Sequence, residues 1–125
     1  MGEFMRKFFN PVIFLEVARK IKDNNDLHGE GKFRTAIGRA YYAAFLTTRE
    51  YLATRYLIKF EKERQHQKVL DKLDELEEFT LRNMLDTLRD NRVNADYFLK
   101  TLIDKELCEN CLDLSEQIIG SVEGI

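Results

Sequence analysis

The sequence is short of the residues that interrupt helices: it has one proline and six glycines among 125 residues, and it has no tryptophan. With so few chain breakers and an ordinary apolar content, the chain does not have the composition of a disordered protein. Runs that alternate apolar and polar residues between turn residues are nearly absent, which argues against a protein built mainly of β-strands. No apolar run approaches the roughly 18 residues of a membrane span, and the N-terminal residues do not form a secretory signal. We therefore expect a cytoplasmic protein with no membrane contact.

A large net charge and a rich set of metal ligands are lacking too. The net charge of −2 argues against nonspecific nucleic-acid binding through overall charge, although it leaves room for a local basic patch. The two cysteines, Cys108 and Cys111, have the CxxC spacing, but a metal site needs two more ligands and the only histidines are His28 and His66. Both cysteines extend an apolar helical stripe, so we expect buried free thiols, no metal and no cofactor.

What the sequence has instead is one long helical pattern, over residues 33–56. Its apolar positions recur at steps of three and four, which is the period of an α-helix, over about six turns. Small residues such as Ala36, Gly38 and Ala40 lie within the stripe and let a partner helix approach closely. A helix that is apolar over so wide a face is not stable alone in water, so we expect it to be the central element of an all-α domain.

Weaker apolar stripes predict four more helices, over residues 11–22, 64–77 and 80–90 and from Asp104 onward. Asn91 and Asn94 favour turns, and they predict a break after the fourth helix. The connections are short, so neighbouring helices should pack antiparallel. The sequence therefore predicts an up-and-down bundle of four to five antiparallel helices in a single domain over residues 1–125, with residues 1–9 a flexible leader.

The most unusual polar cluster lies around this expected break. Two arginines, Arg89 and Arg92, stand close together in the sequence, and paired arginines can grip a phosphate group. The carboxylates of Asp90 and Asp96 can equally hold them in a structural ion-pair network. Arg39, on the long helix, suits an inward-facing partner for Asp96, because a buried arginine without a carboxylate costs several kcal/mol. Both interpretations of the cluster remain open from the sequence.

His66 is the other polar residue that stands out. It lies near the start of the third predicted helix, among Arg64, Gln65, Gln67 and Lys68. Such a neighbourhood is typical of an exposed or helix-capping histidine. The alternative is a histidine that faces a phosphate of a nucleotide or of RNA.

Taken together, these segments resemble the HEPN domain. The resemblance rests on Arg-Ala-Tyr-Tyr-Ala-Ala-Phe at residues 39–45, on His66 in the following helix, and on Arg-x-x-x-Asp-Tyr at residues 92–97. It covers residues 10–122, and it is greatest to the small stand-alone archaeal and bacterial branch long catalogued as uncharacterised.

This resemblance implies a bundle of four or five helices that is usually dimeric. Many HEPN domains are metal-independent RNases that act as toxins or in defence against phage. Their motif is an arginine followed, after about four to six residues, by a histidine, and two copies meet to form the active site. Other members are noncatalytic and bind a minimal nucleotidyltransferase encoded beside them. In some of these pairs the transferase adds AMP to a tyrosine just past the histidine.

The sequence departs from the catalytic pattern at one position. Counting from Arg89 or Arg92, the expected histidine is missing, and Asp96 and Tyr97 stand there instead. A carboxylate is ionised near neutral pH and repels RNA phosphate, whereas imidazole titrates near neutrality. We therefore expect a noncatalytic module that forms a homodimer, belongs to a toxin–antitoxin or defence pair, and binds a minimal nucleotidyltransferase or a nucleotide.

The predicted contact surface comprises Arg89, Arg92, Asp96 and Tyr97, with Arg39 and His66 as further candidates. The alternative is a metal-independent RNase toxin with a degenerate motif. In that case Arg89 and Arg92 hold the scissile phosphate of RNA, and His66 carries out the proton transfer. The sequence leaves open whether the chain is an enzyme.

Overall fold

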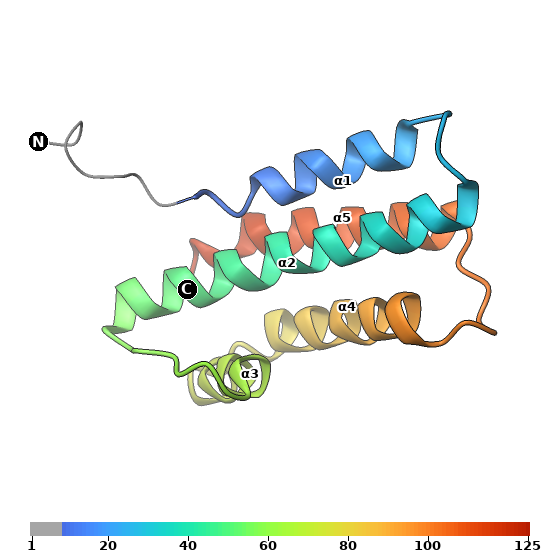
Figure 1. Ribbon diagram of the computed structural model, residues 1–125. Coiled ribbons are helices and arrows are strands. Elements are labelled where there is room, and N and C mark those ends of the chain that lie inside the picture. Colours follow the sequence, from blue (N-terminus) through green and yellow to red (C-terminus); the bar gives the residue numbers. More distant parts are fainter. Residues whose placement is uncertain (1–8) are drawn as a thin grey trace, which may run out of the picture.

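The computed structural model describes residues 9–125, and its regular structure is helical throughout that range (Figure 1). Five helices follow one another in the order α1 (Ile13–Asp23), α2 (Gly29–Tyr56), α3 (Gln65–Glu75), α4 (Phe79–Tyr97) and α5 (Lys105–Val122). The predicted all-α bundle is therefore confirmed. The expected leader, residues 1–9, lies outside the described residues except for Phe9. None of the helices from residue 9 onward has the length and hydropathy to cross a bilayer.

Helix α2 is the centre of the bundle, as its sequence pattern predicts. It packs against all four other helices, and α1, α2, α4 and α5 lie side by side with successive directions reversed (Figure 1). The shorter α3 is set across the end where α2 finishes and α4 begins. Along α2, the fully buried alanines Ala36, Ala40 and Ala44 allow neighbouring helices to approach closely. At one of these points the Ser115 hydroxyl of α5 donates a hydrogen bond to the Ala40 carbonyl, at 2.7 Å.

The start of α2 lies four residues before the predicted one. His28 caps the helix, because its Nδ1 atom accepts a hydrogen bond from the Gly31 N–H at 3.3 Å. The first turn is polar and glycine-rich, so apolar periodicity does not register it. The additional turn brings Glu30 into α2 and places Arg34 in its second turn.

The predicted break after the fourth helix is wrong, because α4 continues without interruption to Tyr97. The Asn91 side chain donates to the Thr87 carbonyl, one turn back, and so supports the helix instead of ending it. Arg92 and Asp96 form an ion pair one turn apart, with Nη1 and Oδ2 separated by 3.0 Å. The polar cluster therefore lies on one regular helix, which fixes the relative positions of its side chains.

A partly buried arginine on α2 caps the C-terminal end of α4. The Arg34 guanidinium donates to the carbonyls of Ala95 at 2.9 Å and Thr101 at 2.6 Å, and its side chain is only 15% exposed. Weaker bonds reach the carbonyls of Asn94 and Phe98 at 3.4 Å. Carbonyls at a helix end have no partner within their own helix, and Arg34 supplies one from about 60 residues away in the chain.

The two cysteines of α5 are free thiols buried in the core, as the sequence predicts. Burial raises the pKa of Cys108 to about 11. The same cause raises the pKa of Cys111 to about 12. Both groups are therefore neutral thiols near pH 7 and contribute apolar packing.

The other end of α2 stores backbone strain at Leu57. This residue adopts the left-handed conformation, with φ 55°, and its side chain is 91% exposed. The N–H groups of Leu57 and Ile58 both donate to the Ala53 carbonyl, a helix ending that favours glycine. We expect Leu57→Gly to raise the free energy of unfolding by about 1 kcal/mol, because the strain disappears and no buried contact is lost.

Urea denaturation measures this gain. The matched control is Leu57→Ala, which keeps a Cβ atom and hence the strain, and it should gain little. An equal gain from both variants would show that the exposed leucine side chain, and not the backbone conformation, causes the effect.

Candidate functional site

Two arginines and three aromatic rings meet along α2, which lies between α1 and α4. The Arg39 guanidinium carbon lies 5.0 Å from the centre of the Phe14 ring and 5.2 Å from that of Tyr42. The Arg92 guanidinium carbon lies 5.6 Å from the Tyr42 ring centre and 5.1 Å from that of Tyr41. These five residues form a continuous arrangement of guanidinium groups on aromatic faces, which we call the arginine–aromatic cluster.

Positive charge exceeds negative charge at this cluster. Arg92 pairs with Asp96, but its Nε atom is buried and has no hydrogen-bond partner among the described residues. Within residues 9–125, no carboxylate lies within ion-pair distance of Arg39 or Arg89. The predicted pairing of Arg39 with Asp96 is therefore wrong. Asp96 lies one turn from Arg92 on the same helix and pairs there, while Arg39 rests on the rings of Phe14 and Tyr42.

His66 lies in the first turn of α3 and is bonded on both sides. Its Nδ1 atom is 2.7 Å from the Tyr41 hydroxyl oxygen, and its Nε2 atom is 3.3 Å from Oδ1 of Asp86. Its side chain is only 14% exposed, so the interpretation as an exposed or capping histidine is wrong. Polar neighbours in the sequence suggested exposure, whereas Tyr41 and Asp86 reach His66 from α2 and α4 only in the folded bundle.

The hydrogen bonds of His66 determine which tautomer its neutral form takes. An ionised Asp86 carboxylate can only accept, so Nε2 carries the proton and Nδ1 accepts from the Tyr41 hydroxyl. Burial lowers the pKa of His66, and the positive charges of Arg89 and Arg92 lower it further, although Asp86 opposes them. His66 is therefore neutral at pH 7. Burial also raises the pKa of Tyr41, so its hydroxyl keeps its proton.

A small cleft opens beside this histidine. Its volume is about 290 Å³, and it is lined by Arg64, His66, Gln67, Asp86 and Arg89. The hydrogen bond from the Tyr41 hydroxyl to Nδ1 of His66 joins the arginine–aromatic cluster to the cleft. Arg89 and Arg64 have no carboxylate within ion-pair distance in the described part of the chain, whereas Asp86 is shared between His66 and Arg82. The arrangement suits an anion, because cationic groups line the cleft and its one carboxylate is already engaged.

The site residues predicted from the sequence thus lie on neighbouring parts of α2, α3 and α4, and Tyr97 is at the margin of this group. Tyr97 is the last residue of α4, and its ring is 69% exposed beyond the Arg92–Asp96 ion pair. Sequence reasoning did not identify Asp86, which lies between apolar positions of an amphipathic helix and carries no local signal. In the sequence, Tyr41 and Tyr42 stand out only as part of the motif at residues 39–45, which does not reveal that both rings contact guanidinium groups.

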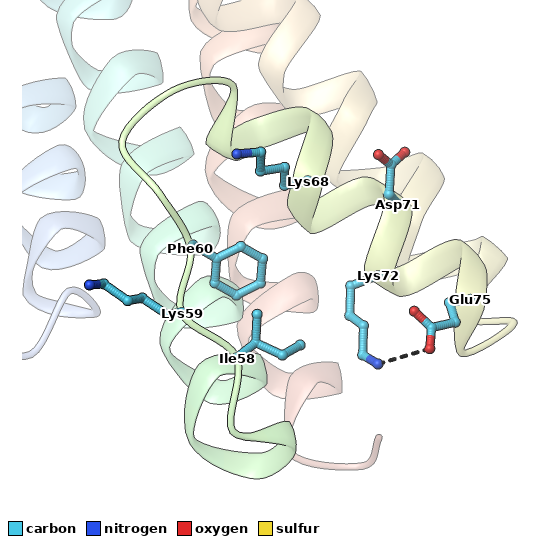
Figure 2. Close-up of a pocket in the computed structure, with 7 residues that line it drawn as sticks. All are labelled: Ile58, Lys59, Phe60, Lys68, Asp71, Lys72 and Glu75. Atoms are coloured by element: carbon cyan, nitrogen blue, oxygen red, sulfur yellow. Dashed lines mark hydrogen bonds and ion pairs between the residues drawn. The ribbon is translucent and has the colours of Figure 1, made fainter.

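A second groove lies away from these residues, between α3 and the connection from α2. Figure 2 shows Ile58 and Phe60 of the connection directed toward α3, where Lys72 and Glu75 form an ion pair at 3.2 Å. The groove has a volume of about 360 Å³. Its other charged residues include Asp71, which accepts a hydrogen bond from Gln67. None of the sequence candidates lines it, so we place no site there.

Comparison with known proteins fits this architecture. The chain belongs to the HEPN family, whose domain model matches residues 15–125. An uncharacterised protein of Methanocaldococcus jannaschii is 34% identical over 113 residues, covering 78% of this chain and 68% of that protein. A second uncharacterised protein of the same archaeon is 52% identical over 42 residues, covering 34% of this chain and 24% of its own length. No solved structure matches the chain.

Family membership also sets the broad class of activity. HEPN domains are nucleotide- or RNA-related modules of toxin–antitoxin-type systems, and they commonly form dimers. The residues of the arginine–aromatic cluster and of the cleft lie within the matched range, except Phe14, which stands one residue before it.

Proposed function

We propose that this protein is a noncatalytic HEPN module of a toxin–antitoxin or defence pair. It forms a homodimer and binds the phosphate of a nucleotide, either free or held by a minimal nucleotidyltransferase partner. The observation that carries the proposal is that Arg39 and Arg92 share the Tyr42 ring beside one paired carboxylate, that of Asp96, while Arg89 lines the neighbouring cleft. The buried Nε atom of Arg92 finds no hydrogen-bond partner within residues 9–125, and an anionic oxygen would supply one.

The state of His66 favours binding over catalysis. A general base needs a free nitrogen directed at the substrate, but both ring nitrogens of His66 are bonded within the chain, to Tyr41 and Asp86. The position where HEPN RNases carry a histidine is occupied by Asp96, which is tied to Arg92. The anion is therefore bound without being cleaved.

One observation favours a second candidate, a metal-independent RNase. His66 and Arg89 line the same cleft, so a proton-transfer group and a phosphate ligand lie together although the sequence motif lacks its histidine. This activity requires His66 to release Asp86 or Tyr41 when RNA binds. Cleavage of RNA by the purified protein, abolished in His66→Gln, would support this candidate and contradict the first.

Calorimetric titration with ADP or pyrophosphate tests the proposed binding. We expect Arg92→Gln to weaken the affinity at least about tenfold, because a charge-assisted hydrogen bond contributes roughly 1.5–3 kcal/mol. Arg92→Lys keeps the charge but not the planar fork, so its affinity should fall between the two. The matched control is Arg19→Gln, which removes an exposed arginine that pairs with Glu116 of α5.

Two outcomes would overturn the proposal. Unchanged affinity in Arg92→Gln would show that the arginine–aromatic cluster is not part of the binding site. Equal losses of affinity in Arg92→Gln and Arg19→Gln would show that only the net charge of the protein matters. The partner is tested separately, by co-purifying the protein with the product of any neighbouring nucleotidyltransferase gene. In that experiment Arg92→Gln and Tyr97→Ala should weaken the complex, because both residues lie on the predicted contact surface.

A further inference from the structure

We propose that the anion site takes up a proton when it fills: binding of an anion in the cleft beside Arg89 is coupled to protonation of His66. The inference rests on the proposed anion binding and adds its regulation by pH. It follows from the position of His66, which lines the cleft and at the same time bonds to Tyr41 at the edge of the arginine–aromatic cluster.

Protonation of His66 rearranges the hydrogen bond to Tyr41. In the neutral form Nδ1 accepts a hydrogen bond from the Tyr41 hydroxyl, whereas in the cationic form Nδ1 must donate one to the hydroxyl oxygen. The hydroxyl proton then has to turn to another acceptor. Tyr41 is only 3% exposed, and among the described residues its hydroxyl has no other hydrogen-bond partner. Protonation of the empty site therefore leaves a buried donor unpaired, which is unfavourable.

The charges around His66 act in the same direction. The groups that face it or its neighbours are Tyr41 and Arg49 from α2, Arg64 just before α3, and Arg82, Asp86, Arg89 and Arg92 from α4. Of these described groups, only Asp86 stabilises the imidazolium, and Asp86 also contacts Arg82 at 3.7 Å. In the empty site the cations dominate, which keeps His66 neutral at pH 7.

A bound anion in the cleft opposes the charge term, because it offsets the positive charges of Arg89 and Arg92 that keep His66 neutral. The anion therefore stabilises the protonated histidine. By linkage, the protonated histidine must raise the affinity for the anion by the same factor. The site binds anions more tightly in acid, and it releases a proton when the anion leaves.

Titration calorimetry with sulfate tests the coupling, because sulfate stays fully ionised where phosphate itself titrates. We expect the affinity of the wild-type protein for sulfate to rise about tenfold between about pH 8 and about pH 5.5. His66→Gln should show little pH dependence over that range. The matched control is His28→Asn, which replaces the only other histidine at a helix cap where asparagine is well accepted, and it should keep the full pH dependence.

The outcomes separate this inference from the proposed function. Absence of sulfate binding at both pH values, with nucleotide binding also absent, overturns the proposed anion site. Binding of equal strength at both pH values leaves that site intact and overturns the coupling. Loss of the pH dependence in His28→Asn would show that His28, and not His66, takes up the proton.

A second measurement needs no variant. Titrations of the wild-type protein in buffers with different ionisation enthalpies give the number of protons taken up with each sulfate. We expect a clear fraction of one proton at about pH 7. Zero uptake at this pH and at about pH 6 would contradict the proposal even if His66→Gln fails to fold.

Discussion

Replacing Phe45 by alanine is expected to lower the free energy of unfolding by about 3–5 kcal/mol. The ring is 5% exposed, and it stacks on Tyr41 with ring centres 5.6 Å apart and an interplanar angle of 9°. It also lies 5.8 Å from the His66 ring. The substitution therefore leaves a cavity at the centre of the bundle and removes one wall of the histidine site. A loss of this size is a large part of the roughly 5–15 kcal/mol that stabilises a typical domain.

Urea denaturation gives the size of this loss, provided that the denaturant slope stays constant. The matched control is Phe79→Ala at the start of α4, where the ring is 55% exposed. That variant should lose less than about 1 kcal/mol. Similar losses at the two positions would mean that burial does not decide the contribution of these rings.

Replacing Arg34 by methionine is expected to cost about 2–3 kcal/mol, although it keeps most of the aliphatic stem. The cost arises because the carbonyls of Ala95 and Thr101 lose a charged donor in a half-buried place. A surface arginine behaves differently: Arg19→Met, which breaks an exposed pair with Glu116, should change stability by less than about 1 kcal/mol.

Hydrogen exchange distinguishes this capping role from a general loss of stability. The amides of Phe98 and Thr101 are bonded to the carbonyls of Asn94 and Phe98 in the segment that Arg34 holds. In Arg34→Met they should exchange faster than core amides by more than the global change explains. Uniform acceleration along the whole chain would contradict a local role for Arg34.

The fold could be predicted where local pattern and tertiary packing agree. The apolar residues of α2 are sufficient to predict this helix, because the side chains that repeat at helical spacing are the ones buried in the core. The end of α4 could not be predicted in this way. Asn91 and Asn94 favour a turn locally, but the Arg92–Asp96 pair and the distant Arg34 hold the helix together.

The candidate site could be predicted in part for a similar reason. Arg92 and Asp96 are four residues apart, so their pairing follows from helical geometry. The environment of His66 does not, because its partners come from α2 and α4, which are separate in sequence. The partner of Arg39 was predicted wrongly since the sequence offers a carboxylate but does not reveal the two aromatic rings on which the guanidinium rests.

The buried thiols of α5 have a practical consequence. Alkylating reagents attack the thiolate, and at Cys108 and Cys111 this species is both scarce and shielded, so labelling in native buffer requires the helix to open first. The rate of labelling therefore reports how readily α5 opens in the absence of denaturant. Every variant described above retains Cys108 and Cys111, so its opening can be measured without a further change to the chain.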